Sequence, residues 1–188
     1  KPLTLHGALQ EKARDPGTAK FSIEYSEVAT AAGRMRTILS HPKSSGKHPA
    51  LLFIQGYSPI SYDYKLDGSG LDGAILSDFA NSNFVTLRVD KPGVGDSEGG
   101  PYGEVDFTIE ADIYRQALKQ LVAQSDVDPE RVVIFGHSMG GAFGPIVARL
   151  KSTPAIQNLE TRLFNVRERM SAITNAPVPG LSLAKAAE

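Results

Sequence analysis

Short apolar runs alternate with amphipathic segments through the middle of this sequence, and that alternation restricts its possible folds more than any other feature. Three runs dominated by apolar residues have the length and composition of strands that are buried on both faces; they are Ala50–Ile54, Phe84–Val89 and Arg131–Phe135. Leu71–Asn83 and Phe107–Gln124 lie between these runs and carry apolar residues at helical spacing. The alternation predicts an α/β fold in which helices cover both faces of a mostly parallel sheet.

Two extended stretches, Phe21–Val28 and Arg34–Ser40, come before the first of these runs. The residues between them include Ala31-Ala32-Gly33, a short sequence suited to a turn. We therefore predict an antiparallel hairpin at the N-terminal edge of the sheet.

The alternation stops after the helical segment Ala142–Leu150, because no apolar, β-branched run follows that could form the next strand. Apolar residues recur at intervals of three and four from Ile156 to Ile173, which predicts an amphipathic helix. This helix has two interpretations: a lid or packing helix, and an interface through which two copies of the chain form a homo-oligomer. The predicted organisation is the first half of an α/β core at 1–150, an amphipathic helix at 151–175 and a tail at 176–188.

The sequence Gly136-His137-Ser138-Met139-Gly140 lies between the third apolar run and the helical segment after it. In this context the pattern Gly-x-Ser-x-Gly is typical of the tight strand-to-helix turn called a nucleophile elbow. Such a turn holds the serine in a strained backbone conformation, and glycine at 136 and 140 lets the two arms pass each other. We predict that Ser138 Oγ is held above the sheet, with the Met139 amide directed at the point where an oxyanion would form.

Three segments resemble, in order, the motifs of the α/β-hydrolase superfamily of esterases, lipases and serine peptidases. Gln55-Gly56-Tyr57 resembles the oxyanion loop, Asp90–Gly99 resembles the loop after the next strand, and Gly136–Gly141 resembles the elbow. The likeness covers residues 20–150, and it is greatest to the esterase-like and acyl-peptidase-like branch.

This resemblance implies a serine hydrolase with a Ser-His-acid triad, acting on a small-molecule ester or a peptide through an acyl-serine intermediate. It makes Ser138 the nucleophile and the backbone N–H groups of Tyr57 and Met139 the oxyanion hole. Gln55 replaces the usual histidine, which matters little because the hole uses main-chain donors. No metal and no organic cofactor is implied.

The general base and its acid are not found in this chain. The family places both after the serine, yet no His and no Asp follow Ser138. His41 and His48 flank a turn expected at the opposite end of the sheet, and His137 is predicted to point away from the serine beside it. His6 has no supporting pattern around it.

Three explanations account for a nucleophile elbow in a chain where no general base or acid is found. The first is a truncation, or an omitted stretch after about residue 150; we prefer it because a sheet that ends at the elbow strand leaves an exposed edge. Lys1 in place of an initiator Met fits the same idea and leaves export possible. In the second, another copy of the chain supplies the missing groups through 156–173. The third is our alternative function, a non-catalytic relative that binds a ligand or a partner protein over the elbow.

Composition excludes several other classes of protein. Because 20 Lys and Arg balance 21 Asp and Glu, the chain has no positive electrostatic field that would attract a nucleic acid. No apolar run reaches the roughly 18 residues of a membrane span, and zero Cys excludes disulfides, thiol nucleophiles and Cys-ligated metals. Gly93–Glu98 begins like a dinucleotide-binding loop, but Glu98 stands where that loop has glycine, so we do not expect it to bind a dinucleotide. Asp63–Gly68 has part of the spacing of a calcium-binding loop, but Lys65 occupies a ligand position, so we interpret it as a turn. The sequence leaves the substrate and the cellular compartment open.

Overall fold

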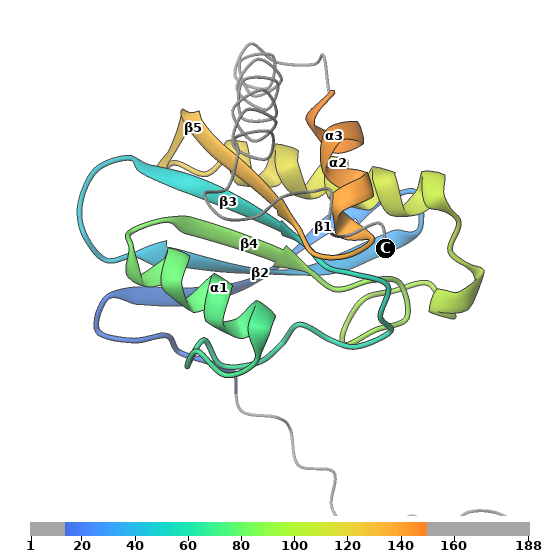
Figure 1. Cartoon of the computed structure of the whole chain (residues 1–188), viewed down its shortest axis with the longest axis horizontal. Helices are drawn as coiled ribbons and strands as arrows, with labels where there is room; N and C mark the ends of the chain where they lie inside the picture. The colour runs from blue at the N-terminus through green and yellow to red at the C-terminus, as the bar shows by residue number, and fades with distance from the viewer. Residues whose placement is uncertain (1–13, 150–188) are drawn as a thin grey trace, which may run out of the picture.

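The computed structural model describes residues 14–149, which form one sheet with helices on both of its faces (Figure 1). Its strands are β1 Phe21–Thr30, β2 Gly33–Pro42, β3 His48–Ile54, β4 Val85–Val89 and β5 Val127–Gly136, in the order β1-β2-β4-β3-β5. β1 and β2 form the predicted antiparallel hairpin, and β2 is also antiparallel to β4. β3 runs parallel to both of its neighbours, β4 and β5. The α/β class and the N-terminal hairpin are therefore confirmed.

The connections between the strands contain the helices α1 Leu71–Asn81, α2 Phe107–Val122 and α3 Gly140–Ala148, together with the single turn η1 Tyr102–Glu104. α1 packs on one face of the sheet, and α2 and α3 pack on the other (Figure 1). Asp106 caps α2, since its carboxylate accepts a hydrogen bond from the Ile109 N–H at 2.8 Å. Of the helices in this part of the chain, none is long and apolar enough to span a bilayer.

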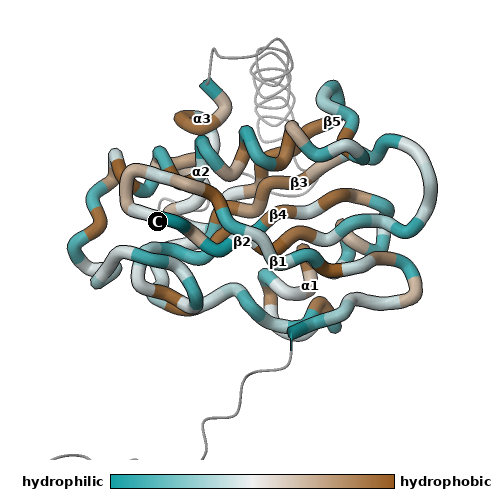
Figure 2. The backbone as a smooth tube through the Cα atoms, turned by 180° about the vertical axis from the view of Figure 1, so that it is seen from behind, coloured by the Kyte–Doolittle hydropathy of each residue, from teal (hydrophilic) through white to brown (hydrophobic). Residues whose placement is uncertain are grey.

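The core has two layers because the side chains of a strand point alternately to the two faces. Leu52 and Ile54 of β3 enter the layer beneath α2 and α3, whereas Leu51 and Phe53 enter the layer beneath α1. Burial of each such side chain contributes about 1.5–3 kcal/mol. Figure 2 shows the apolar residues concentrated along β3 and β4, in the middle of the sheet. The packed sheet therefore fixes the carboxyl ends of β3, β4 and β5, from which the loops of the candidate site leave.

The helix predicted at Ile156–Ile173, the tail at 176–188 and His6 lie outside the described residues. The division of the chain at residues 150 and 175 stays a prediction.

Candidate active site

Ser138 lies in a tight turn between the end of β5 at Gly136 and the start of α3 at Gly140. The carbonyl oxygens of His137 and Ser138 accept hydrogen bonds from the N–H groups of Gly140 and Gly141, at 2.8 and 2.9 Å. Ser138 has a φ of 53°, which residues other than glycine rarely adopt, and it is exposed. The turn therefore presents a serine hydroxyl outside the core at a strained backbone position.

Gly136 and Gly140 occupy positions where a Cβ has no room. A methyl group on Gly136 would overlap the backbone of Gly140, and one on Gly140 would overlap the carbonyl oxygen of Ile54. The His137 N–H donates to that same Ile54 oxygen at 2.9 Å. Close backbone contact therefore fixes the elbow against the end of β3, where the predicted oxyanion loop begins.

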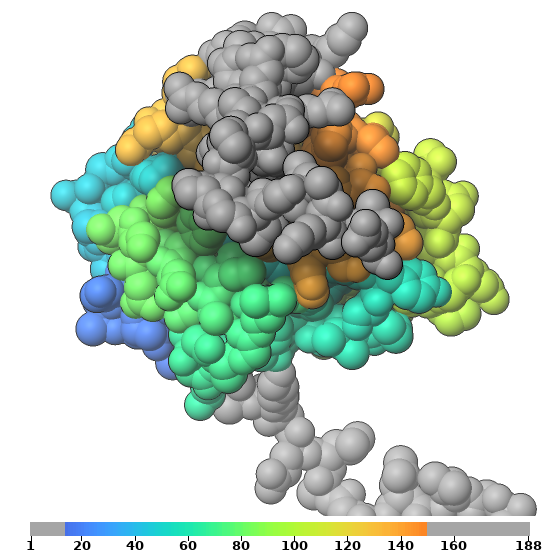
Figure 3. All heavy atoms as spheres, viewed as in Figure 1, coloured from blue at the N-terminus to red at the C-terminus, as the bar shows by residue number. Residues whose placement is uncertain are grey.

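The segment that follows β3 runs beside the elbow, as Figure 3 shows in teal and orange. A Cβ built on Gly56 would lie 3.1 Å from the Cβ of Ser138 and 3.7 Å from its Oγ, so the Gly56–Tyr57 peptide borders the serine. Within residues 14–149, the N–H groups of Tyr57 and Met139 donate to no protein acceptor. The structure thus brings Ser138 together with the two residues that the resemblance assigns to the oxyanion hole.

Two of the histidines lie far from the elbow. His41 Nδ1 is 2.8 Å from the carboxylate of Asp126, and His48 Nε2 is 3.0 Å from a main-chain carbonyl oxygen. Both belong to the end of the sheet where β3 begins, opposite the elbow. Within the described residues, no hydrogen bond joins a histidine to Ser138.

His137 turns toward α1, where its Nδ1 lies 2.9 Å from a carboxylate oxygen of Asp72. The other Asp72 oxygen accepts a hydrogen bond from the Tyr62 hydroxyl at 2.5 Å. Burial, together with the hydrogen bond to Asp72, raises the pKa of Tyr62, so the phenol stays protonated. The sequence did not predict this chain of contacts, because His137 and Asp72 lie on separate elements with no spacing that links them.

A second cluster that the sequence did not predict lies under the oxyanion loop. The buried Lys91 ammonium donates to the carbonyl oxygen of Gly56 and to the hydroxyl of Tyr102, both at 2.7 Å. A carboxylate oxygen of Glu110 lies 2.7 Å from the same nitrogen. The cluster joins the loop after β4, the turn η1 and the first turn of α2.

Polar groups of the loop at 90–99 form hydrogen bonds to β2 and to the segment after β3. The Asp90 carboxylate is fully buried and accepts hydrogen bonds from the Tyr62 N–H at 2.7 Å and from Arg36 Nε at 2.9 Å. Ser97 Oγ accepts from the Arg36 N–H at 2.9 Å and donates to the Asp90 carbonyl oxygen at 3.2 Å. In the part of the chain that the structure describes, no group of three or more His, Asp or Glu is placed to hold a metal.

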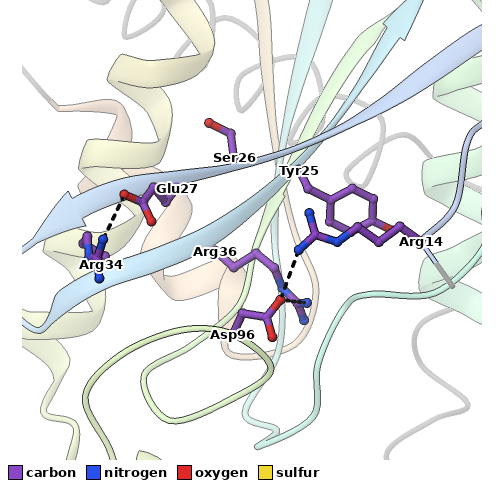
Figure 4. A pocket seen from close by; sticks show the side chains of 7 residues that line it. All are labelled: Arg14, Tyr25, Ser26, Glu27, Arg34, Arg36 and Asp96. Carbon is purple, nitrogen blue, oxygen red and sulfur yellow. Dashed lines mark hydrogen bonds and ion pairs between the residues drawn. The ribbon is translucent and has the colours of Figure 1, made fainter. Parts of the chain in front are cut away.

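A polar pocket of about 280 Å³ lies beside the hairpin. Its lining residues are Arg14, Tyr25, Ser26, Glu27, Arg34, Arg36 and Asp96 (Figure 4). Arg14 and Arg36 lie 3.8 and 2.8 Å from Asp96, and Arg34 lies 3.4 Å from Glu27. The arginines are thus already paired, and the pocket shares no residue with the elbow or the oxyanion loop.

Comparison with known proteins adds a family and a curated relative. A family model described as alpha/beta hydrolase family matches residues 51–186. The chain is 26% identical over 149 residues to the polyketide transferase ATR5 of Stachybotrys chlorohalonatus, a match that covers 71% of this chain and 48% of that protein.

Solved structures share the fold at low sequence identity. A hypothetical protein from Pseudomonas aeruginosa superposes with a TM-score of 0.61 and 21% identity over 79% of this chain and 46% of its own. The alpha/beta hydrolase GrgF from a Penicillium species gives 0.55 and 22%, over 69% and 42%. The carboxylesterase EstE1, cloned from a metagenomic library, gives 0.51 and 21%, over 73% and 44%. This chain therefore spans less than half the length of each of these four relatives.

Proposed function

The chain belongs to the alpha/beta hydrolase family, and from that premise we propose that the protein hydrolyses an ester or amide, in a small molecule or a peptide, through an acyl-Ser138 intermediate. The observation that carries the proposal is the exposed serine at a φ of 53°, with the Gly56–Tyr57 peptide against it. Nucleophilic catalysis needs this combination of an accessible hydroxyl and preorganised donors.

In the proposed reaction, Ser138 Oγ bonds to the substrate carbonyl carbon and its proton passes to a base outside the described contacts. The electron pair of the carbonyl π bond moves to oxygen, and the amides of Tyr57 and Met139 donate to that oxyanion. The pair returns to re-form the carbonyl as the base gives its proton to the leaving alcohol or amine. Water, which loses a proton to the same base, then attacks the acyl-serine and releases the acid. One oxyanion donor is worth about 10²–10³ in rate, so both amides matter to turnover.

A fluorophosphonate probe tests the proposal, because phosphonylation requires a nucleophilic serine. We expect the probe to label the protein once, on the peptide that contains Ser138, and Ser138→Ala to reduce labelling to background. Ser125→Ala is the control, since it removes another exposed serine hydroxyl and should be labelled like the wild type. Mass spectrometry of the digested protein measures both. An unlabelled but folded wild-type protein would favour the alternative, a binding protein that lacks a complete triad.

His137→Asn should change the labelling rate by no more than about fivefold, because this partly exposed residue pairs with Asp72 instead of the nucleophile. A histidine that served as the general base would instead contribute about 10²–10⁴ in rate. His41→Asn, at the opposite end of the sheet, is the control. A loss of 100-fold or more in His137→Asn, with an unchanged unfolding midpoint, would show that His137 is the base.

The similarity to a polyketide transferase favours a second candidate, in which acyl-Ser138 passes its acyl group to an acceptor hydroxyl in place of water. Tyr57 and Met139 support it, because they leave 69% and 44% of their surface exposed beside the serine and give the site an apolar border. Once an activated ester that acylates the protein is known, added alcohols separate the two candidates. Transfer predicts that ester product replaces free acid as the alcohol concentration rises.

A further inference from the structure

A lysine with almost no solvent contact lies directly beneath the predicted oxyanion hole. Lys91 is 1% exposed, and its ammonium has three N–H donors. Each donor has an acceptor at 2.7 Å: the carbonyl oxygen of Gly56, the hydroxyl of Tyr102 and a carboxylate oxygen of Glu110. All three donors are thus in use, and none is left for the substrate.

Stability alone does not explain this arrangement. Burial lowers the pKa of Lys91, and the hydrogen bond and charge of Glu110 oppose that effect. A buried ion pair of this kind is often no more stabilising than apolar side chains of the same volume. The contact of Lys91 with the carbonyl oxygen of Gly56 indicates a role beside the serine.

Gly56 O and the N–H of Tyr57 belong to one planar trans peptide, so they point in opposite directions. The Lys91 ammonium donates a hydrogen bond to the oxygen from within the protein. Gly56 itself borders Ser138, because a Cβ built on Gly56 would lie 3.1 Å from the Cβ of Ser138. A cation on the carbonyl draws electron density from the peptide and makes its N–H a stronger donor. We propose that Lys91 is a positioning residue that orients and polarises the Gly56–Tyr57 peptide, so that the Tyr57 N–H serves as a preorganised oxyanion donor. This inference rests on the proposed function.

The surrounding side chains hold the lysine and the peptide in place. The Tyr102 ring packs against the Tyr57 ring with centroids 5.4 Å apart, and Lys91 Nζ lies 4.5 Å from the Tyr102 centroid. Burial, with the charge of Glu110 adding to it, raises the pKa of Tyr102 to about 12, so the hydroxyl remains protonated. Glu110 is anchored in the first turn of α2. The peptide is thus fixed at its carbonyl by Lys91 and at its following side chain by Tyr102.

A double variant, Lys91→Met with Glu110→Gln, removes the ammonium without leaving a buried carboxylate unpaired. We expect its maximal fluorophosphonate labelling rate to fall about 10- to 100-fold, somewhat less than loss of a whole oxyanion donor. The probe concentration at half-maximal rate should stay within about threefold of wild type, because Lys91 contributes no contact to the probe. Lys119→Met is the control; it removes an exposed lysine of α2 whose ammonium donates to Gln116 instead of Gly56, and it should label at nearly the wild-type rate. Equal unfolding midpoints establish that all variants are folded.

The backbone amide resonance of Tyr57 gives a second readout that needs no catalysis. Its nitrogen and proton shifts report the polarisation of the Gly56 carbonyl, so they should move in the double variant and stay near wild type in Lys119→Met. A folded double variant with the wild-type labelling rate, or an unmoved Tyr57 resonance, would overturn the inference. A wild-type protein that the probe does not label would overturn the proposed function instead, and the Tyr57 resonance alone would then decide whether Lys91 polarises this peptide.

Discussion

Replacing Gly136 with alanine is expected to lower the free energy of unfolding by about 3 kcal/mol and the labelling rate of Ser138 at least about 100-fold. A Cβ on Gly136 would overlap the carbonyl of Gly140 and lie 2.6 Å from the nitrogen of Gly141. All of these atoms are backbone, so no side-chain rotation relieves the overlap. β5 and α3 would have to separate, which moves Ser138 away from the Gly56–Tyr57 peptide.

Gly141→Ala is the matched control for this substitution. The nearest atom to a Cβ there is the Gly136 oxygen at 3.7 Å, an ordinary contact. Because alanine is favoured over glycine in helices by about 0.5–1 kcal/mol, the control should be neutral or slightly stabilising. Urea unfolding followed by circular dichroism, together with fluorophosphonate labelling, compares the two variants. A Gly136→Ala protein with the midpoint and labelling rate of the control would contradict the prediction, because it would show that the elbow can accommodate a Cβ at residue 136.

The strands and helices could be predicted because their signals are local. The run Ala50–Ile54 is continuous and apolar, and it forms the centre of β3. Elsewhere the bounds differ where polar residues hide the pattern: β5 begins at Val127, although Asp128-Pro129-Glu130 interrupts the apolar run. α1 ends at Asn81 instead of continuing to Asn83, which adopts a φ of 62° that no helix allows.

The site was predictable only in part. A strained serine follows from Gly-x-Ser-x-Gly, since the turn itself requires it, and the structure gives Ser138 that conformation. The contact between Lys91 and Gly56 could not be predicted, because it joins residues 35 positions apart on different loops. Pairs of this kind depend on the order of the strands, which periodicity does not determine. The roles of Ser138, Tyr57 and Met139 stay predictions until labelling tests them.

The contacts of the loop that begins at Asp90 also could not be predicted from the sequence, although the resemblance identified the loop itself. Asp90 and Arg36 form the centre of a buried charge network that joins β2, β4 and the segment after β3. Nη1 of Arg36 lies 2.8 Å from Asp96 and 3.3 Å from Asp63, and Nη2 donates to Ser61 at 2.8 Å. Burial would lower the pKa of Arg36, but the carboxylates, with Asp90 first, more than offset it and raise that pKa. The guanidinium therefore stays charged, and it compensates a carboxylate that solvent does not reach.

Replacing Arg36 with methionine is expected to lower the free energy of unfolding by about 3–5 kcal/mol, because it leaves the buried Asp90 carboxylate uncompensated. Arg34→Met is the matched control, since Arg34 lies two residues earlier on β2 and its side chain is 60% exposed; its loss should be far smaller. Urea unfolding midpoints measure both. If the orphaned carboxylate causes the loss, Asp90→Asn must recover part of it in the Arg36→Met background. Equal midpoints for the two arginine variants would mean that water reaches Asp90, and that the network contributes no more than an exposed pair.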